Sequence, residues 1–224
     1  MTNEEVKGKL ISRLEKWPVG EIPKLPFISK FEKEEKTVKV NRPISQANIF
    51  LGHAGVSRDN ADYYALTVMN YILGGGGFSS RLVVEIRNKK GLAYSVASYF
   101  DPGKYPGSFQ IALQTKNSSA REAIAISIQE MDRIQKKLVS EKELEGAKKY
   151  LIGSFPMRFD TQGKLTNFLT QVEYYGLGLN YPEKYPSLIQ SVTREEVLRV
   201  ARKYLHPKSY VLAIVANLKE AGME

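Results

Sequence analysis

The chain has 224 residues, of which 33 are basic and 24 acidic, giving a formal net charge of +9. The basic residues are dispersed and no basic block carries interleaved aromatic residues, so the composition favours a solvated surface over a nucleic-acid site. Cysteine is absent and no apolar run approaches the roughly 20 residues that span a bilayer, which excludes disulfides, thiolate metal sites and a membrane span. With no secretory segment at its N-terminus, we expect a cytoplasmic protein.

The first 30 residues have the pattern of a helix followed by a connector. Residues 3–17 place apolar side chains at positions 6, 10, 11 and 14, the spacing of a short amphipathic helix. Residues 18–27, PVGEIPKLPF, contain three prolines, which favour an extended connector. We therefore expect residues 1–30 to form a helix and a Pro-rich connector that joins a preceding segment, so Met1 need not be the native start.

Residues 31–224 are expected to form a single domain. The segments with strand patterns are residues 36–40, 46–56, 92–100, 107–115 and 209–216. The segments with helical spacing are residues 59–73, 79–90, 118–138, 140–155, 163–177, 182–190 and 193–204. The strand at 46–56 is nearly all apolar and should be central. This order predicts an α+β fold with a mostly antiparallel β-sheet and helices packed on one face.

Several helix ends carry typical capping residues. The expected N-terminal caps are Asp59, Ser79 or Ser80, Ser140 with Glu143, and Thr193 with Glu196, the last two pairs having capping-box spacing. Gly91 lies just past residues 79–90 and should end that helix, because glycine readily adopts the left-handed conformation of a C-terminal cap.

Neither histidine has the neighbours that a zinc site needs. His53 stands at a predicted strand end and His206 precedes Pro207, and the sequence contains neither H-E-x-x-H nor H-x-x-E-H. Residues 74–77, four glycines, lack the Lys and the spacing of a phosphate-binding loop, and they follow a helix rather than a strand. The run favours a hinge after a helix, although its backbone amides could also bind a polypeptide.

The stretch LGGGGFSSRLVVEIRNKKGLAYSV, residues 73–96, resembles the pitrilysin/insulinase family of zinc metallopeptidases, and more closely its bacterial members related to mitochondrial processing peptidase. The later stretches SEKELEGAKKYLIGSF, YGLGLNYPEKY and SVTREEVLRVARKYLHPKSYVLAIV are similar to the same family, so the likeness covers nearly the whole chain. It implies the processing-peptidase/LuxS-like metallohydrolase fold. Members enclose a chamber between two homologous halves or subunits, one carrying H-x-x-E-H with zinc and the other zinc-free.

By this resemblance, the chain is the C-terminal, zinc-free half of a metalloendopeptidase and closes the proteolytic chamber. The resemblance implies zinc in a catalytic half or subunit that carries H-x-x-E-H, no metal in this chain, and a peptide substrate. The family pattern R-x-x-x-x-x-x-Y falls on Arg87 and Tyr94, which would bind the peptide and assist the transition state. The Gly-rich segment implicated in handling substrate falls on Gly74, Gly75, Gly76 and Gly77.

Other interpretations stay open at this point. Arg87 at a helix end and Tyr94 in a strand are also ordinary structural positions. A proteolytically inactive assembly subunit, resembling the core subunits of a respiratory complex, is the alternative function, and a basic nucleic-acid module is a third. In isolation the chain could also form a homodimer. A net charge of +9 does not suit a cavity for basic peptides, so either acidic residues line the catalytic half or the substrates are not basic.

Overall fold

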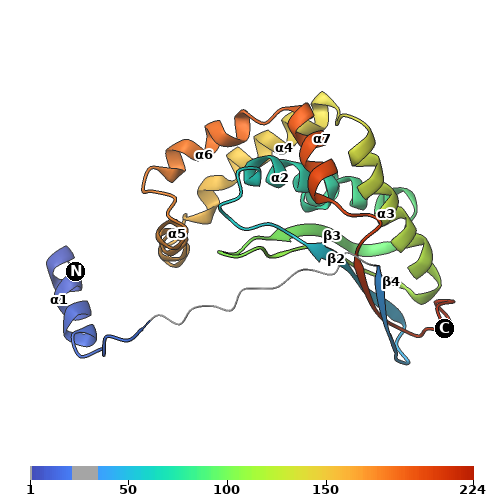
Figure 1. Ribbon diagram of the computed structural model, residues 1–224, viewed down its shortest axis with the longest axis horizontal. Helices are drawn as coiled ribbons and strands as arrows, with labels where there is room; N and C mark the ends of the chain where they lie inside the picture. The colour runs from blue at the N-terminus through green and yellow to red at the C-terminus, as the bar shows by residue number, and fades with distance from the viewer. Residues whose placement is uncertain (1, 22–34) are drawn as a thin grey trace. The chain divides into compact units, whose positions relative to one another are not determined.

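The structure is a computed structural model that describes residues 2–21 and 35–224 (Figure 1). Two compact units are distinguished, Met1–Lys30 and Phe31–Glu224. In the first unit, α1 (Asn3–Leu14) begins with a capping box between Thr2 and Glu5, and none of its residues is buried within the chain. The helix ends three residues earlier than residue 17, the predicted end. Most of the predicted connector lies outside the described residues.

The second unit is built on a five-stranded sheet in the order β1-β5-β2-β4-β3. The strands are β1 (Lys36–Asn41), β2 (Gln46–Ala54), β3 (Ala93–Asp101), β4 (Ser108–Lys116) and β5 (Val211–Ala216). As predicted, β2 is central and most pairs are antiparallel. The exception is β1, which lies parallel to β5 at one edge of the sheet. The opposite edge is formed by β3.

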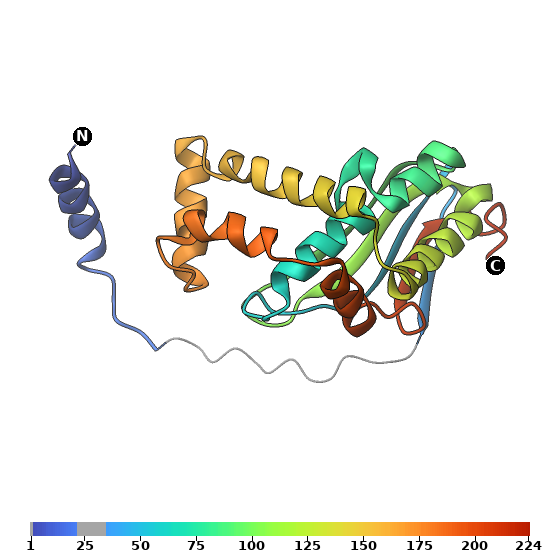
Figure 2. The ribbon, with the colours of Figure 1, turned by 90° about the horizontal axis from the view of Figure 1, so that it is seen from above.

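Most helices of the second unit lie on one face of this sheet, whereas α5 (Gln162–Tyr174) lies beyond its end (Figures 1 and 2). The other α-helices of this unit are α2 (Tyr63–Asn70), α3 (Ala120–Lys136), α4 (Glu141–Gly153), α6 (Tyr181–Gln190) and α7 (Arg194–Tyr204). The short turns are the π-helical η1 (Tyr71–Gly75) and η3 (Val83–Lys89), and the 3₁₀ turns η2 (Gly77–Ser79), η4 (Asn117–Ser119) and η5 (Phe155–Arg158). The predicted α+β class is confirmed.

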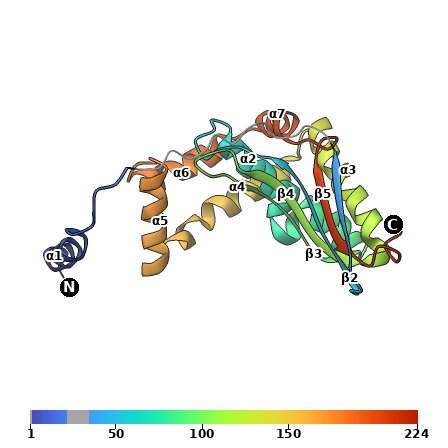
Figure 3. The ribbon, with the colours of Figure 1, turned by 60° about the horizontal axis from the view of Figure 1, so that its bottom comes forward.

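The core lies between the sheet and its helices, and the strand alternation explains why. Ile49 on β2 and Phe109 on β4 point toward the helices and are buried. Their strand neighbours alternate to the other face, where Phe50 is 49% exposed and Gln110 is half-buried. No helix of the second unit covers that other face, which comes forward in Figure 3.

The predicted cap at Asp59 is wrong. Residues 58–59 form a turn, and α2 begins only at Tyr63, after Asp62. The Asp62 carboxylate does not cap the helix but forms ion pairs with Arg199 at 2.6 Å and Lys203 at 3.0 Å on α7. These two long-range ion pairs engage the Asp62 carboxylate, so it is not available to cap the helix.

The two predicted capping boxes are confirmed. Ser140 accepts from the backbone N–H of Glu143 at 3.2 Å, and the Glu143 carboxylate accepts from the Ser140 backbone at 2.8 Å. Thr193 and Glu196 make the same reciprocal pair at 3.1 and 2.9 Å. Each box satisfies two backbone donors that the first helical turn leaves without partners, so the sequence pattern alone locates these helix starts.

Candidate functional site

The segment with the strongest sequence signal forms a helix, a tight turn and an edge strand. Residues 81–89 are helical, largely as η3, and Gly91 follows with φ +63°. The Gly91 N–H donates to the Arg87 carbonyl at 3.0 Å, and the Leu92 N–H donates to the Ile86 carbonyl at 2.9 Å. Each of these bonds reaches one residue further back than in a Schellman motif, in keeping with the π-helical η3, and the left-handed Gly91 lies just past the helix end as expected. The turn leads at once into β3.

The predicted pair Arg87 and Tyr94 is in contact. The guanidinium carbon of Arg87 lies 4.7 Å from the centroid of the Tyr94 ring. The ring centroid of Phe78 is also 4.7 Å from that carbon. Arg87 therefore contacts two aromatic rings, each within the range of a cation–π interaction. Both rings are largely exposed, Tyr94 at 83% and Phe78 at 71%.

A β-bulge sets the position of Tyr94. Ala93 pairs with Thr115 and Ser95 pairs with the adjacent Gln114, so Tyr94 is an extra residue on β3 with no partner in the register. A bulge breaks the regular alternation of side chains and redirects the one that it carries. The Tyr94 side chain therefore does not follow the regular alternation between the two faces of the sheet, although the residue belongs to the edge strand β3.

Neither the Arg87 guanidinium nor the Tyr94 hydroxyl forms a hydrogen bond within the described part of the chain. The guanidinium of Arg87 makes its two aromatic contacts but no hydrogen bond or ion pair with a described residue. The Tyr94 hydroxyl likewise has no hydrogen-bond partner among the described residues. Arg offers five N–H donors in a fixed fork, and a phenol offers one O–H donor. The arrangement can therefore bind the carbonyl oxygens of an extended polypeptide.

The glycine run is a tightly packed turn between two π-helical segments. A Cβ atom at Gly74 would lie 2.6 Å from the Ser98 backbone nitrogen and 2.7 Å from Leu82 Cδ1, so the turn can approach β3 only as glycine. Gly77 has φ +56° and open space around it, and leads directly to Phe78. The chain does turn here after a helix, whereas a hinge role and substrate binding by the glycines both stay predictions.

The expected serine cap after the glycines differs in detail. Ser80 does precede the helix, but its hydroxyl donates to the Gly77 carbonyl at 2.7 Å and caps no helical N–H. Ser79 lies in η2 and donates to the Gly76 carbonyl at 2.9 Å. The two serines therefore hold the glycine turn closed, since their hydroxyls are taken by its carbonyls.

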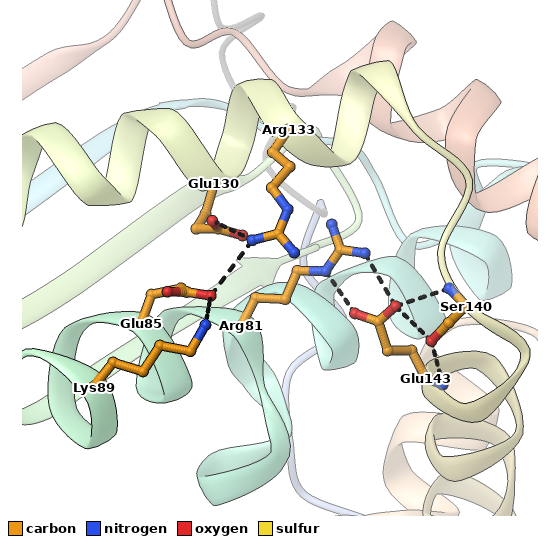
Figure 4. A network of polar contacts seen from close by, with 7 residues as sticks. All are labelled: Arg81, Glu85, Lys89, Glu130, Arg133, Ser140 and Glu143. Carbon is orange, nitrogen blue, oxygen red and sulfur yellow. Dashed lines mark hydrogen bonds and ion pairs between the residues drawn. The ribbon is translucent and has the colours of Figure 1, made fainter.

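A polar network holds the helix that carries Arg87 (Figure 4). Arg81 donates to both carboxylate oxygens of Glu143 at the start of α4, at 2.6 and 3.1 Å. One turn further, Glu85 contacts Arg133 of α3 at 3.4 Å, and Lys89 at 2.8 Å. These residues recur every four positions on one side of the helix, whereas Arg87 lies between them in sequence and outside the network.

The Glu143 carboxylate joins this network to the capping box. Burial alone would raise its pKa, but hydrogen bonds from Arg81 and Ser140 outweigh burial and lower the pKa to about 2. Arg81 itself is only 9% exposed. Since both partners are charged and mostly shielded from water, this ion pair fixes the start of the helix more firmly than a surface pair would.

The two histidines, 153 residues apart, lie together. Their ring centroids are 4.8 Å apart, and His53 also stacks on Phe109. The Nδ1 of His53 is 2.8 Å from the Ala54 carbonyl, so it carries the proton, and Nε2 accepts from the His206 backbone N–H at 3.2 Å. Burial lowers the pKa of His53 to about 4, so this ring is neutral near pH 7. Both ring nitrogens of His53 are therefore hydrogen-bonded to the backbone.

No group of three or more His, Cys, Asp or Glu side chains suited to a metal ion occurs in the described ranges 2–21 and 35–224. The same part of the chain contains no helix that is long and apolar enough to cross a membrane. The described domain thus combines an α+β layer with a contact between Arg87 and Tyr94 at the edge strand of its sheet.

The chain belongs to the peptidase M16 family. The family description "Peptidase M16 inactive domain" matches residues 1–151. A "non-peptidase homolog YmxG" of Helicobacter pylori is 30% identical over 97% of this chain, and an "uncharacterized zinc protease" of Streptomyces coelicolor is 31% identical over 81% of it. The predicted family and its zinc-peptidase character are confirmed.

The fold is shared with a solved member of the family. The crystal structure of a peptidase M16 inactive domain from Pseudomonas fluorescens superimposes with a TM-score of 0.86 at 28% identity. This comparison covers 96% of the chain and 52% of that protein. The chain likewise spans 50% of the Helicobacter relative and 39% of the Streptomyces relative. The matched proteins are thus about twice as long as this chain or longer.

Proposed function

We propose that this chain is the zinc-free half of an M16 endopeptidase, in which it closes the chamber and presents Arg87 and Tyr94 to a bound peptide. The observation that carries the proposal is the contact between these two exposed side chains, whose donors are unused in the described chain. The family match and the longer relatives support a second half outside this chain.

The chemistry of the pair suits peptide hydrolysis. In this proposal, zinc bound by the catalytic half supplies the activated water. The Tyr94 hydroxyl donates a hydrogen bond to the carbonyl oxygen on which negative charge develops, and this interaction strengthens as the charge grows. The Arg87 fork binds neighbouring backbone carbonyls of the extended peptide and orients it. Contacts with Phe78 and Tyr94 keep the guanidinium in place while its donors face the ligand.

The bare face of the sheet supports a chamber wall. Phe50, Val211 and Tyr99 all lie on the face opposite the helices and are 49%, 41% and 37% exposed. A groove of about 390 Å³ lies over Gly52, whose missing side chain forms its floor between β2, β4 and β5. Exposed apolar surface of this kind typically meets another polypeptide. In the proposal that polypeptide is the catalytic half together with its substrate.

Reconstitution tests the proposal. The purified chain alone should show neither peptidase activity nor bound zinc, and addition of the H-x-x-E-H-bearing half or subunit from the same source should produce cleavage. A mixture with the glutamate of that motif replaced serves as the control, since it retains assembly but loses the catalytic base. Robust cleavage by the chain alone would contradict the proposal, as would an active catalytic half that gains nothing from this chain.

One observation favours a second candidate, a subunit that assembles without proteolysis. The Helicobacter relative is named a non-peptidase homolog, and it covers 97% of this chain. The two candidates differ in their partner: the assembly role requires a partner without H-x-x-E-H. Co-purification from the native source followed by peptide sequencing of the partner separates them.

A further inference from the structure

A second cavity, of about 200 Å³, lies where α5, α6 and the loop before α2 meet. These elements are different from those that carry Arg87 and Tyr94. The cavity is lined by Arg58, Tyr63, Arg158, Lys164, Asn167, Phe168, Gln171, Val172, Tyr175, Leu177 and Tyr181. Three of these side chains are cationic and none is acidic. The lining therefore has the composition of a site for an anion.

Arg58 is the buried cation of this cavity, at 9% exposure. Its guanidinium carbon lies 3.7 Å from the centroid of the Tyr63 ring, and its Nη2 donates to the Tyr181 hydroxyl at 3.0 Å. Within the described residues it forms no ion pair with a carboxylate. The aromatic contacts offset part of the cost of burying the charge, but they supply no counter-ion.

Only one of the other two cations is neutralised. Lys164 forms an ion pair with Asp160 at 2.8 Å. Arg158 is exposed and lies about 5 Å from two aromatic rings, with its carbon 5.3 Å from the Phe155 centroid, but it has no ion pair in the described chain. Two arginines thus border one cavity without a carboxylate partner.

We propose that this cavity binds the carboxylate of a small organic acid or of a peptide C-terminus. Arg58 and Arg158 supply the charge, and the amides of Asn167 and Gln171 supply further donors. The walls also include Phe168, Val172 and Leu177, which suit the apolar stem of an acid. Such a mixed lining favours a carboxylate on a short stem over a fully hydrated phosphate. The site does not depend on the proteolytic proposal.

The test is an NMR titration of the full, isotopically labelled chain with five simple probes. Butyrate should shift the resonances of Asn167, Leu177 and their neighbours, whereas butyramide, which has the same shape without the charge, should not. Inorganic phosphate should bind more weakly than butyrate. A short peptide with a free C-terminus and its C-terminally amidated form distinguish the two sources, because tighter binding of the free acid than of butyrate assigns the site to peptide ends.

Variants locate the binding. Arg158→Gln should weaken the binding of butyrate at least about tenfold, because a charge-assisted contact is lost. Since Arg158 is exposed, its replacement should leave the core intact. Arg121→Gln on α3 removes the same charge at an exposed position outside the cavity, and should leave the affinity unchanged. Equal binding of butyramide, tighter binding of phosphate, or unchanged affinity in Arg158→Gln would each overturn the proposal.

Discussion

Arg87 and Tyr94 come from consecutive elements, and their contact, 4.7 Å from guanidinium carbon to ring centroid, depends on two backbone features. The left-handed Gly91 ends the helix directly before β3, and the bulge at Tyr94 takes this side chain out of the sheet alternation. The geometry therefore links a local backbone arrangement to the site that the sequence resemblance indicates.

Phe78 should matter for activity but not for stability. It contacts Arg87 and is 71% exposed, so Phe78→Ala removes one of the two rings that hold the guanidinium. An exposed cation–π contact contributes about 0.5–1 kcal/mol, which predicts a two- to fivefold loss of kcat/KM in the reconstituted peptidase. The urea midpoint should stay unchanged. A large loss of stability, or unaltered kinetics, would show that Phe78 has another role.

The glycines should differ in their tolerance of a methyl group. Gly74→Ala places Cβ against Ser98 and Leu82 and should cost about 1–3 kcal/mol, as overpacking does. Gly77→Ala meets no atoms but retains φ +56°, and should cost about 1–2 kcal/mol. The control is Gly146→Ala on α4, where space is open and the helix should gain roughly 0.5–1 kcal/mol. Urea unfolding of the three variants tests these values, and a Gly74→Ala variant as stable as Gly146→Ala would refute the packing argument.

His53 should make the protein less stable in mild acid. Its pKa is about 4 when folded, against 6.5 for an ordinary histidine, because burial disfavours the charged ring. The unfolded chain therefore binds the proton first as the pH falls. The contribution of neutral His53 to the free energy of unfolding is fully present above pH 6.5 and is lost as the pH falls toward 4. The loss should be about 2 kcal/mol between pH 7 and pH 5.

Urea unfolding at the two pH values measures this term. In His53→Gln the difference between pH 7 and pH 5 should shrink, whereas His206→Gln should retain most of it, since burial of the His53 ring is the main cause of its lowered pKa and the His206 backbone N–H that donates to His53 stays in place. These are the only two histidines in the chain. A pH dependence that survives in His53→Gln but disappears in His206→Gln would reverse the assignment.

The Arg81–Glu143 pair should contribute more than an exposed pair on the same helix. Glu143→Gln removes the charge that faces the buried Arg81 and should cost about 1.5–3 kcal/mol. Glu141→Gln is the matched control, because its ion pair with Arg194 leaves the Glu141 side chain 70% exposed and should contribute under about 1 kcal/mol. Similar losses in both variants would contradict the burial argument. The Glu143 contribution should also fade as the pH drops from about 4.5 toward 2, since its folded pKa is lowered.

Local patterns in the sequence predicted the structure correctly where interactions between near neighbours in the chain determine it. The capping boxes at Ser140 and Thr193 locate α4 and α7 because donor and acceptor lie three residues apart. The nearly all-apolar composition of residues 46–56 likewise indicated the central strand, and in the structure its side chains alternate between the core and the bare face. The Gly91 helix end is likewise a local effect of a left-handed residue.

The sequence did not predict features that depend on contacts between distant segments of the chain. The prediction placed the cap at Asp59, but α2 starts after Asp62, whose carboxylate pairs with Arg199 and Lys203 of α7 and does not cap the helix. The parallel pairing of β1 with β5 and the meeting of the two histidines have no local signal. Phe78 was also missed, although an aromatic residue directly after a glycine turn, close to a predicted site, is a signal that could have been used.

The central claim is that Tyr94 donates a hydrogen bond to the peptide in the transition state. Tyr94→Phe in the reconstituted peptidase should lower kcat about 100-fold or more with little change in KM, because loss of one such donor costs about 2.7–4 kcal/mol. Tyr150→Phe removes a hydroxyl from an exposed tyrosine on α4, away from the site and the bare face of the sheet, and should retain full activity. An unchanged kcat in Tyr94→Phe, measured with an intact assembly, would contradict the account.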